Sequence, residues 1–231
     1  MKKQIGLLLL TMLLFTVTQA QLSATDSLRA KKDSTLRALL HEDSAKIDKE
    51  YAAKEKDLAN KEKWDKIEAK SVYPLLKGGK NSAVVPVKDP TEIPDPNIDY
   101  KLLFEVTANN PDSTIKDIND GLNEVARVIN LHIASGVPLK RILPVVVVHG
   151  PALHALKNNA AFQKKYKINN PSIQLFEDLR KIGVKFIVCG QAMEFVGVKP
   201  EELLPGIKLS LTAKTVLTSY QLKGYVWQPV W

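Results

Sequence analysis

The feature that most constrains the fold is the segment "KRILPVVVVHG" at residues 140–150, an almost unbroken run of β-branched residues. Such a run is typical of a strand that is covered on both faces of a sheet. The segments "YKLLFEVT" (100–107) and "VKFIVCG" (184–190) have the same character, and "GIKLSL" (206–211) predicts a fourth strand. A terminal strand or tail is expected in the final segment "YVWQPVW".

Between these strands, the apolar residues recur with a helical period. Residues 113–134 predict a helix with a wide apolar face, with Asp112 or Ser113 as its N-cap. An amphipathic helix is expected at 172–183, and shorter or final helices are expected at 151–159, 191–197, 200–204 and 212–224. Regular alternation of strand and helix predicts a three-layer α/β/α fold with a mainly parallel sheet of about five strands.

The first twenty residues have a different composition. Met1, Lys2 and Lys3 form a short positive region, an apolar core follows, and Ala20 is suited to cleavage by signal peptidase. This pattern predicts a signal peptide at residues 1–20 and therefore a periplasmic or secreted protein. The alternative is an uncleaved anchor, for which the apolar run is short. No cysteine follows the apolar core, so a lipid anchor is not expected.

The rest of the chain divides into three parts by composition. Residues 21–70 are highly charged, contain no Pro or Gly, and predict one or two long, largely solvated helices. Three roles are open for them: packing on the domain, oligomerisation with another subunit, or a spacer. Residues 71–97 hold five prolines and are expected to be a linker, with a short strand around Val84. Residues 98–231 are the predicted α/β domain.

Composition and missing motifs exclude several classes of function. The formal net charge is +8, but acidic residues interrupt the basic ones almost everywhere, so we expect a solvated surface and no nucleic-acid binding. The chain has no G-x-G-x-x-G or phosphate loop, no C-x-x-C, no His/Cys cluster and no G-x-S-x-G elbow. We therefore expect no cofactor and no metal. The adjacent acids Glu177 and Asp178 are expected on a solvated helix face.

The predicted site lies where three strands end. In an open parallel sheet, ligands bind beyond the carboxyl ends of the strands. Those ends supply Cys189 and His149 as candidate catalytic residues. They also supply the candidate ligand-binding residues Asn109, Gly150, Gly190 and Gln191. A thiol at a strand end, beside an imidazole, suits a nucleophile or a persulfide carrier. Gly190 is expected to leave space beside the sulfur.

Cys189 is the only cysteine, so a disulfide within the chain is excluded. Three readings stay open: a reactive thiol, half of an intermolecular disulfide, or a buried packing residue, which is the commoner role of a free cysteine. A thiol oxidoreductase would need a resolving cysteine from a partner. His154 is expected at the surface, and no role is assigned to His41 or His132.

Several segments of the chain resemble the DsrE/DsrF-like family of sulfur-relay proteins over about residues 98 to 229. The resemblance is carried by "YKLLFEVT", by "VVVVHGPALHAL" and by the long stretch "LRKIGVKFIVCGQAMEFVGVKPEELLPGIKLSLTAKTVLTSYQLKGYVW". Its clearest pieces are His149-Gly150, Val188-Cys189-Gly190, and the run from Glu202 to Gly206. The order and spacing of these short pieces give the resemblance its specificity.

The resemblance implies a small α/β domain that assembles as a trimer or hexamer. In the sulfur-transferring members, a cysteine at the end of the third strand receives sulfur as a persulfide and passes it to a partner, and Cys189 falls at that strand end. We therefore expect an exported sulfur carrier or transferase with a protein donor or acceptor. The alternative is a non-catalytic envelope module for oligomerisation or ligand binding, in which Cys189 is buried and structural.

Overall fold

The structure, a computed structural model, describes residues 24–38 and 44–230. The predicted signal peptide and His41 lie outside these residues. The chain divides into two compact units, Met1–Ala69 and Lys70–Trp231, which are described separately below. Among the described residues, none of the helices is both long and apolar enough to cross a membrane.

In its described residues, the first unit contains the helices α2 (Ala24–Ala38) and α3 (Ser44–Ala69), as the charged segment predicts. Polar contacts join them: Arg29 pairs with Glu55 at 3.4 Å, and Lys32 pairs with Asp48 at 2.9 Å. Exposed pairs of this kind contribute about 0–1 kcal/mol each. Leu28 and Leu36 on α2, and Ile47, Tyr51 and Leu58 on α3, are half-buried, and none of the described side chains of the two helices is fully buried.

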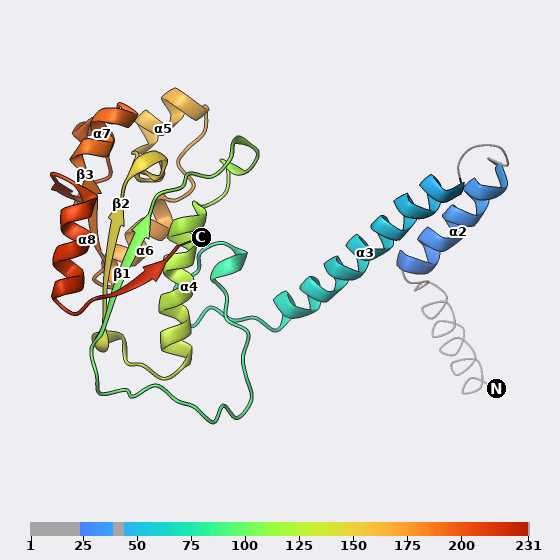
Figure 1. The fold of residues 1–231 in the computed structure, drawn as a ribbon, viewed down its shortest axis with the longest axis horizontal. Helices are drawn as coiled ribbons and strands as arrows, with labels where there is room; N and C mark the ends of the chain where they lie inside the picture. The colour runs from blue at the N-terminus through green and yellow to red at the C-terminus, as the bar shows by residue number, and fades with distance from the viewer. Residues whose placement is uncertain (1–23, 39–43, 231) are drawn as a thin grey trace, which may run out of the picture. The chain divides into compact units, whose positions relative to one another are not determined.

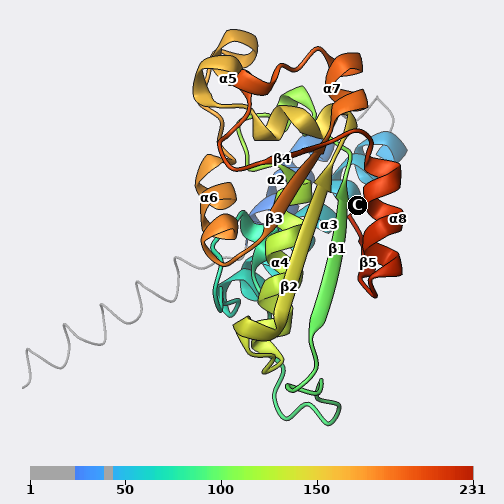
Figure 2. The ribbon, with the colours of Figure 1, turned by 90° about the vertical axis from the view of Figure 1, so that its left-hand side faces the viewer.

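The second unit (Figure 1) is built on a five-stranded sheet with the order β4-β3-β2-β1-β5, which can be followed in Figure 2. All of its described pairings are parallel, which confirms the predicted α/β/α class. The strands are β1 (Tyr100–Val106), β2 (Ile142–Val148), β3 (Lys185–Cys189), β4 (Lys208–Ser210) and β5 (Val226–Pro229). Each strand lies inside or next to a segment that the apolar runs predict.

Helices cover the two faces of the sheet unequally. The larger core lies under α4 (Asp120–Ala134) and α6 (Ile173–Lys181), with buried residues such as Phe104 and Phe176. The smaller core lies on the other face under α8 (Ala213–Leu222), which links the two edge strands (Figure 1). The other helices are α5 (Asn159–Tyr166), α7 (Gly190–Val196) and the 3-10 turns Lys80–Ser82, Asp112–Thr114, Leu139–Arg141, Gly150–Leu156 and Pro200–Glu202.

The start of α4 differs from the prediction. The expected helix at 113–134 begins only at Asp120, and its N-cap is Asn119, whose side chain accepts a hydrogen bond from Leu122 N. The buried amide of Asn110 donates to the carbonyls of Thr114, Asp117 and Ile118, and this holds the preceding residues in a turn. The prediction of Asp112 or Ser113 as the cap is therefore wrong.

Part of the predicted linker packs on the domain. The side chain of Asn130 on α4, fully buried, accepts from Leu76 N at 2.9 Å and donates to the carbonyls of Leu76 and Ser82. Val72 and Val84 pair as an isolated antiparallel bridge, at the place of the expected short strand. Residues 72–84 thus form a strap on α4, whereas the prolines from Pro86 onward lie in exposed, irregular chain.

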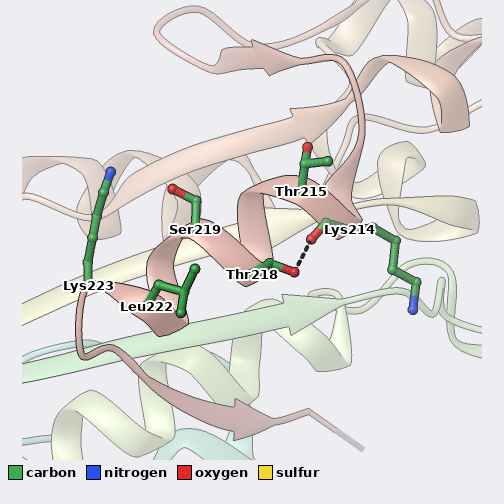
Figure 3. A pocket seen from close by; sticks show the side chains of 6 residues that line it. All are labelled: Lys214, Thr215, Thr218, Ser219, Leu222 and Lys223. Carbon is green, nitrogen blue, oxygen red and sulfur yellow. Dashed lines mark hydrogen bonds between the residues drawn. The ribbon is translucent and has the colours of Figure 1, made fainter.

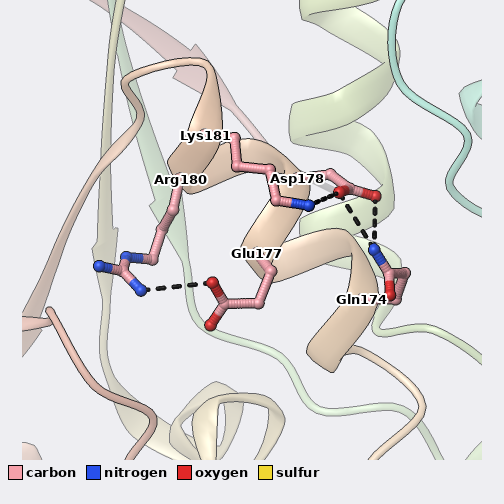
Figure 4. A network of polar contacts seen from close by, with 5 residues as sticks. All are labelled: Gln174, Glu177, Asp178, Arg180 and Lys181. Atoms are coloured by element: carbon pink, nitrogen blue, oxygen red, sulfur yellow. Dashed lines mark hydrogen bonds and ion pairs between the residues drawn. The ribbon is translucent and has the colours of Figure 1, made fainter.

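The acidic pair on α6 is used within its own helix (Figure 4). Asp178 accepts hydrogen bonds from Gln174 and Lys181, and Arg180 pairs with Glu177 at 3.4 Å. The bonds from Gln174 and then Lys181 hold the pKa of Asp178 below its ordinary value. These carboxylates belong to a solvated face, as the sequence predicts.

Candidate functional site

Cys189 ends β3 and is the N-cap of α7, as the position of the thiol predicts. Its sulfur accepts a hydrogen bond from Ala192 N at 3.4 Å. The residue is 5 % exposed and packs with Ile187 and Ala213 in the smaller core. The thiol therefore lies at the carboxyl edge of the sheet but is almost fully covered by the chain.

His149 follows β2 directly and keeps extended backbone, with φ −150° and ψ 173°. Its Nε2 lies 2.9 Å from Oε1 of Glu105, the next-to-last residue of β1. Both side chains are mostly buried, with 26 % of His149 and 20 % of Glu105 exposed. Sequence reasoning did not single out Glu105. The available signal was a charged residue inside an apolar strand that helices cover on both faces.

The three side chains point to the same face of the sheet. Side chains alternate along a strand, and Leu103, Val147 and Ile187 all contribute to the core under α8. Glu105, His149 and Cys189 each stand two residues further along their own chain, so they share that face. Strands β1, β2 and β3 are neighbours (Figure 2). His149 and Cys189 thus form a row at the carboxyl edge, while Glu105, in register with Val147, lies two residues further back on β1 and reaches His149 diagonally.

The spacing within this row follows from the register. Val148 pairs with Val188, so His149 and Cys189 occupy the next register position on adjacent strands. Neighbouring parallel strands are about 4.8 Å apart. No hydrogen bond joins the two side chains in the described part of the chain, where the sulfur is bonded to Ala192 N and the imidazole to Glu105. The structure thus brings the two predicted catalytic residues side by side without direct bonding.

Gly190 has a different role from the one expected of it. A Cβ at this position would lie 2.9 Å from the carbonyl oxygen of Ser210 on β4. The missing side chain therefore admits the backbone of β4, rather than leaving free space beside the sulfur. Gln191 donates its backbone N–H to Leu211 O and leaves its side chain exposed. Gly150 has a left-handed φ of +62°, which favours glycine at the start of the 3-10 turn.

Asn109 is bonded to another element. Its amide donates to Oη of Tyr166 on α5 at 3.2 Å. It also helps to line a small hollow with Phe162 and Ser172. As a ligand-binding residue, Asn109 stays a prediction.

His154 is buried, and the expectation of a surface position is wrong. It is 8 % exposed because the 3-10 turn packs it near Tyr166, with ring centroids 5.9 Å apart. Its Nε2 lies 2.8 Å from Nζ of Lys165, and its Nδ1 is buried without a hydrogen-bond partner. Burial, together with the charges of Lys165 and Lys157, lowers the pKa of His154 to about 4, against the opposing effect of Glu202.

Other surface features offer less chemistry. A shallow hollow on the outer face of α8 lies between Lys214 and Lys223 and contains threonine, serine and leucine side chains (Figure 3). Thr218 in this hollow is bonded to the carbonyl of Lys214 in its own helix. Among the described residues, no group of three or more His, Cys, Asp or Glu side chains could hold a metal ion.

The fold and the row of side chains define a class: an α/β/α domain with a parallel sheet and a single thiol at the sheet's carboxyl edge. The model of the DsrE/DsrF-like family matches residues 101–227, and the chain belongs to this family. The sequence resemblance is thereby confirmed. The family points to a role related to sulfur relay.

Comparisons with individual proteins add little to this assignment. A protein of unknown function from Methanobacterium thermoautotrophicum has a similar solved structure, with 18 % sequence identity and a TM-score of 0.44. The match covers 57 % of this chain and 99 % of that one. None of the curated proteins matches the chain.

Proposed function

We propose that this protein carries sulfur as a persulfide on Cys189, with His149 as the group that accepts and returns the proton of the thiol. The observation that carries the proposal is the juxtaposition of Cys189 and His149, on adjacent strands and the same sheet face, in a member of the DsrE/DsrF-like family. Of the described histidines, His149 is the one next in register to the thiol.

The transfer is an exchange between a thiol and a persulfide. The thiolate of Cys189 attacks the outer sulfur of a donor persulfide R–S–SH and forms a new S–S bond. The donor's S–S bond breaks, and its electron pair leaves on the donor thiolate R–S⁻. The proton that His149 takes from Cys189 passes to this leaving group, which departs as R–SH. No external oxidant or reductant is consumed.

A second function is favoured by one observation, the burial of Cys189. The alternative, a non-catalytic envelope module for oligomerisation or ligand binding, expects a covered structural thiol, and Cys189 is 5 % exposed. On this alternative, the thiol packs beside Ile187 and Ala213 as an ordinary core residue. Function would then survive replacement of Cys189 by serine.

Sulfur loading separates the two proposals. Native protein is incubated with glutathione persulfide and analysed by mass spectrometry after alkylation. The sulfur carrier gains one sulfur atom on Cys189, while a Cys189→Ser variant gains none. A thiol that stays unmodified in the native protein, and resists alkylation until the protein is unfolded, supports the structural alternative.

We also propose export and self-assembly. The composition of residues 1–20 supports a cleaved signal peptide and a periplasmic or secreted location. Phe195 on α7 (86 %), Leu209 on edge strand β4 (62 %) and Leu211 directly after β4 (76 %) are exposed. These apolar side chains support burial against another copy or against a protein donor or acceptor of sulfur. N-terminal sequencing of the secreted protein and light scattering test these two points: Gln21 at the N-terminus and a trimer or hexamer are expected, and an uncleaved monomer contradicts them.

A further inference from the structure

We infer that Glu105 is a positioning residue that fixes the hydrogen of the neutral His149 imidazole on Nε2. The lone pair is then on Nδ1, which acts as the base that accepts the proton of the Cys189 thiol. This inference rests on the proposed sulfur transfer and extends it by one residue. The observation behind it is the 2.9 Å contact between Oε1 of Glu105 and Nε2 of His149.

The contact joins two side chains that have few other partners. Of the polar contacts described in the structure, this is the single one that either side chain makes. Both are mostly buried, and Glu105 stands among the apolar residues of β1. A carboxylate in such a place is costly unless it is paired, so its presence in this strand needs a reason. Holding the imidazole of His149 supplies one.

The pairing determines the tautomer of the imidazole. An ionised carboxylate has no hydrogen to donate, so Nε2 of His149 must carry the hydrogen in this contact. A neutral imidazole has one N–H and one lone pair, and the lone pair is then on Nδ1. Nδ1 has no hydrogen-bond partner among the described residues. It is therefore free to accept a proton.

The arrangement across the sheet connects this base to the thiol. Glu105 is on β1, His149 follows β2 and Cys189 ends β3, which are consecutive strands with the side chains on one face. When the thiol of Cys189 loses its proton, Nδ1 of His149 receives it and the ring becomes a cation. The carboxylate stabilises that cation by charge and by the Nε2–H bond. The proton then passes from Nδ1 to the leaving donor thiolate.

The test compares rates of sulfur loading onto Cys189 from glutathione persulfide by mass spectrometry. Glu105→Gln removes the charge and can donate to Nε2, so loading is expected to slow about tenfold or more. Glu105→Asp keeps the carboxylate and should recover part of the rate.

His149→Ala should slow loading by about a hundredfold. Added imidazole should restore part of that loss without affecting the wild type, because His149 is partly open to solvent.

Glu124→Gln is the matched control. Glu124 is also 20 % exposed and pairs with a cation, Arg127, but it lies on α4 at the opposite face of the sheet. It should load at the wild-type rate. Thermal unfolding of each variant separates loss of folding from loss of rate.

The outcomes distinguish this inference from the proposal beneath it. If the wild type loads and Glu105→Gln loads within about twofold of it, the positioning role is overturned while sulfur transfer stands. If Glu105→Asp is as slow and as destabilised as Glu105→Gln, Glu105 is structural only. If imidazole has no effect on His149→Ala, the proton transfer assigned to His149 in the proposed function is contradicted. If the wild type does not load, the proposed function itself fails.

Discussion

At the scale of single residues, position in the sheet decides which side chains share a site. The alternation of faces along β1 puts Glu105 on the same face as His149 and Cys189, two residues behind them in register but within hydrogen-bond reach of His149, although the three are far apart in sequence. His154, only five residues after His149, belongs to a different cluster because the 3-10 turn carries it under Tyr166. Proximity in sequence is therefore a poor guide to membership of this site.

The burial of His154 predicts a pH-dependent stability. Its pKa is 6.5 in the unfolded chain and about 4 in the fold, so between these values the unfolded chain binds more protons. Stability from this group is complete above pH 6.5 and is lost as the pH falls toward 4, by about 3 kcal/mol in total. Denaturant unfolding from pH 7 to 4 should show this loss in the wild type relative to His154→Gln. Parallel curves for the two proteins would contradict it.

Close packing at Gly190 predicts a steric penalty. Gly190→Ala puts a methyl group 2.9 Å from the backbone oxygen of Ser210, so β3 and β4 must move apart. We expect a loss of about 1–3 kcal/mol in the free energy of unfolding, measured with urea. The exposed neighbour Gln191 offers a control, since Gln191→Ala should change stability by less than about 0.5 kcal/mol. An equally stable Gly190→Ala protein would show that the edge strand yields freely.

At the scale of elements, the strands and most helices could be predicted from sequence, whereas helix α5 and the start of α4 could not. The run from Val145 to Val148 predicts a strand covered on both faces because all of its residues are β-branched and apolar, and the structure has this strand as β2. The start of α4 was hidden because the turn before it depends on the side chain of Asn110, which apolar periodicity does not report. Helix α5 was missed because it buries only Ala161 and Phe162, too few residues to show a period. Glu105 was missed because only its partner, on another strand, reveals its use.

The strap at residues 72–84 lies outside the region that the family model covers, and its bonds to α4 predict an effect on stability. Asn130→Ala removes the side chain that bonds Leu76 N, Leu76 O and Ser82 O. These buried backbone atoms then lose the hydrogen bonds that Asn130 supplies. The expected loss is about 2–4 kcal/mol, with faster proteolysis within residues 71–97. Arg127→Ala on the exposed side of α4 is the control. Unchanged proteolysis in Asn130→Ala would mean that other contacts hold the strap.

At the scale of the whole molecule, the chain consists of a helical pair and an α/β/α unit that begins at Lys70. We expect a chain lacking residues 21–69 to fold and to melt within about 5 °C of the full protein. The reason is that each unit has its own contacts, and the sheet and both cores lie entirely after Lys70. Circular dichroism gives the melting temperature. Loss of solubility, or a much lower melting temperature, would show that the helices support the fold.

The same truncation tests what the helices do for assembly. If α2 and α3 set the oligomer, light scattering should report a smaller species without them. An unchanged assembly would favour the exposed apolar edge at β4 and α7 as the contact surface, with the helices as a spacer.

The proposed function requires that Cys189 is a reactive thiol and not a covered core residue. Mass spectrometry of the native full-length protein after exposure to glutathione persulfide tests it most directly. We expect one added sulfur atom on Cys189, formed more slowly in His149→Ala and Glu105→Gln and at the normal rate in Glu124→Gln. A native protein that gains no sulfur, and whose thiol reacts only after unfolding, would contradict it.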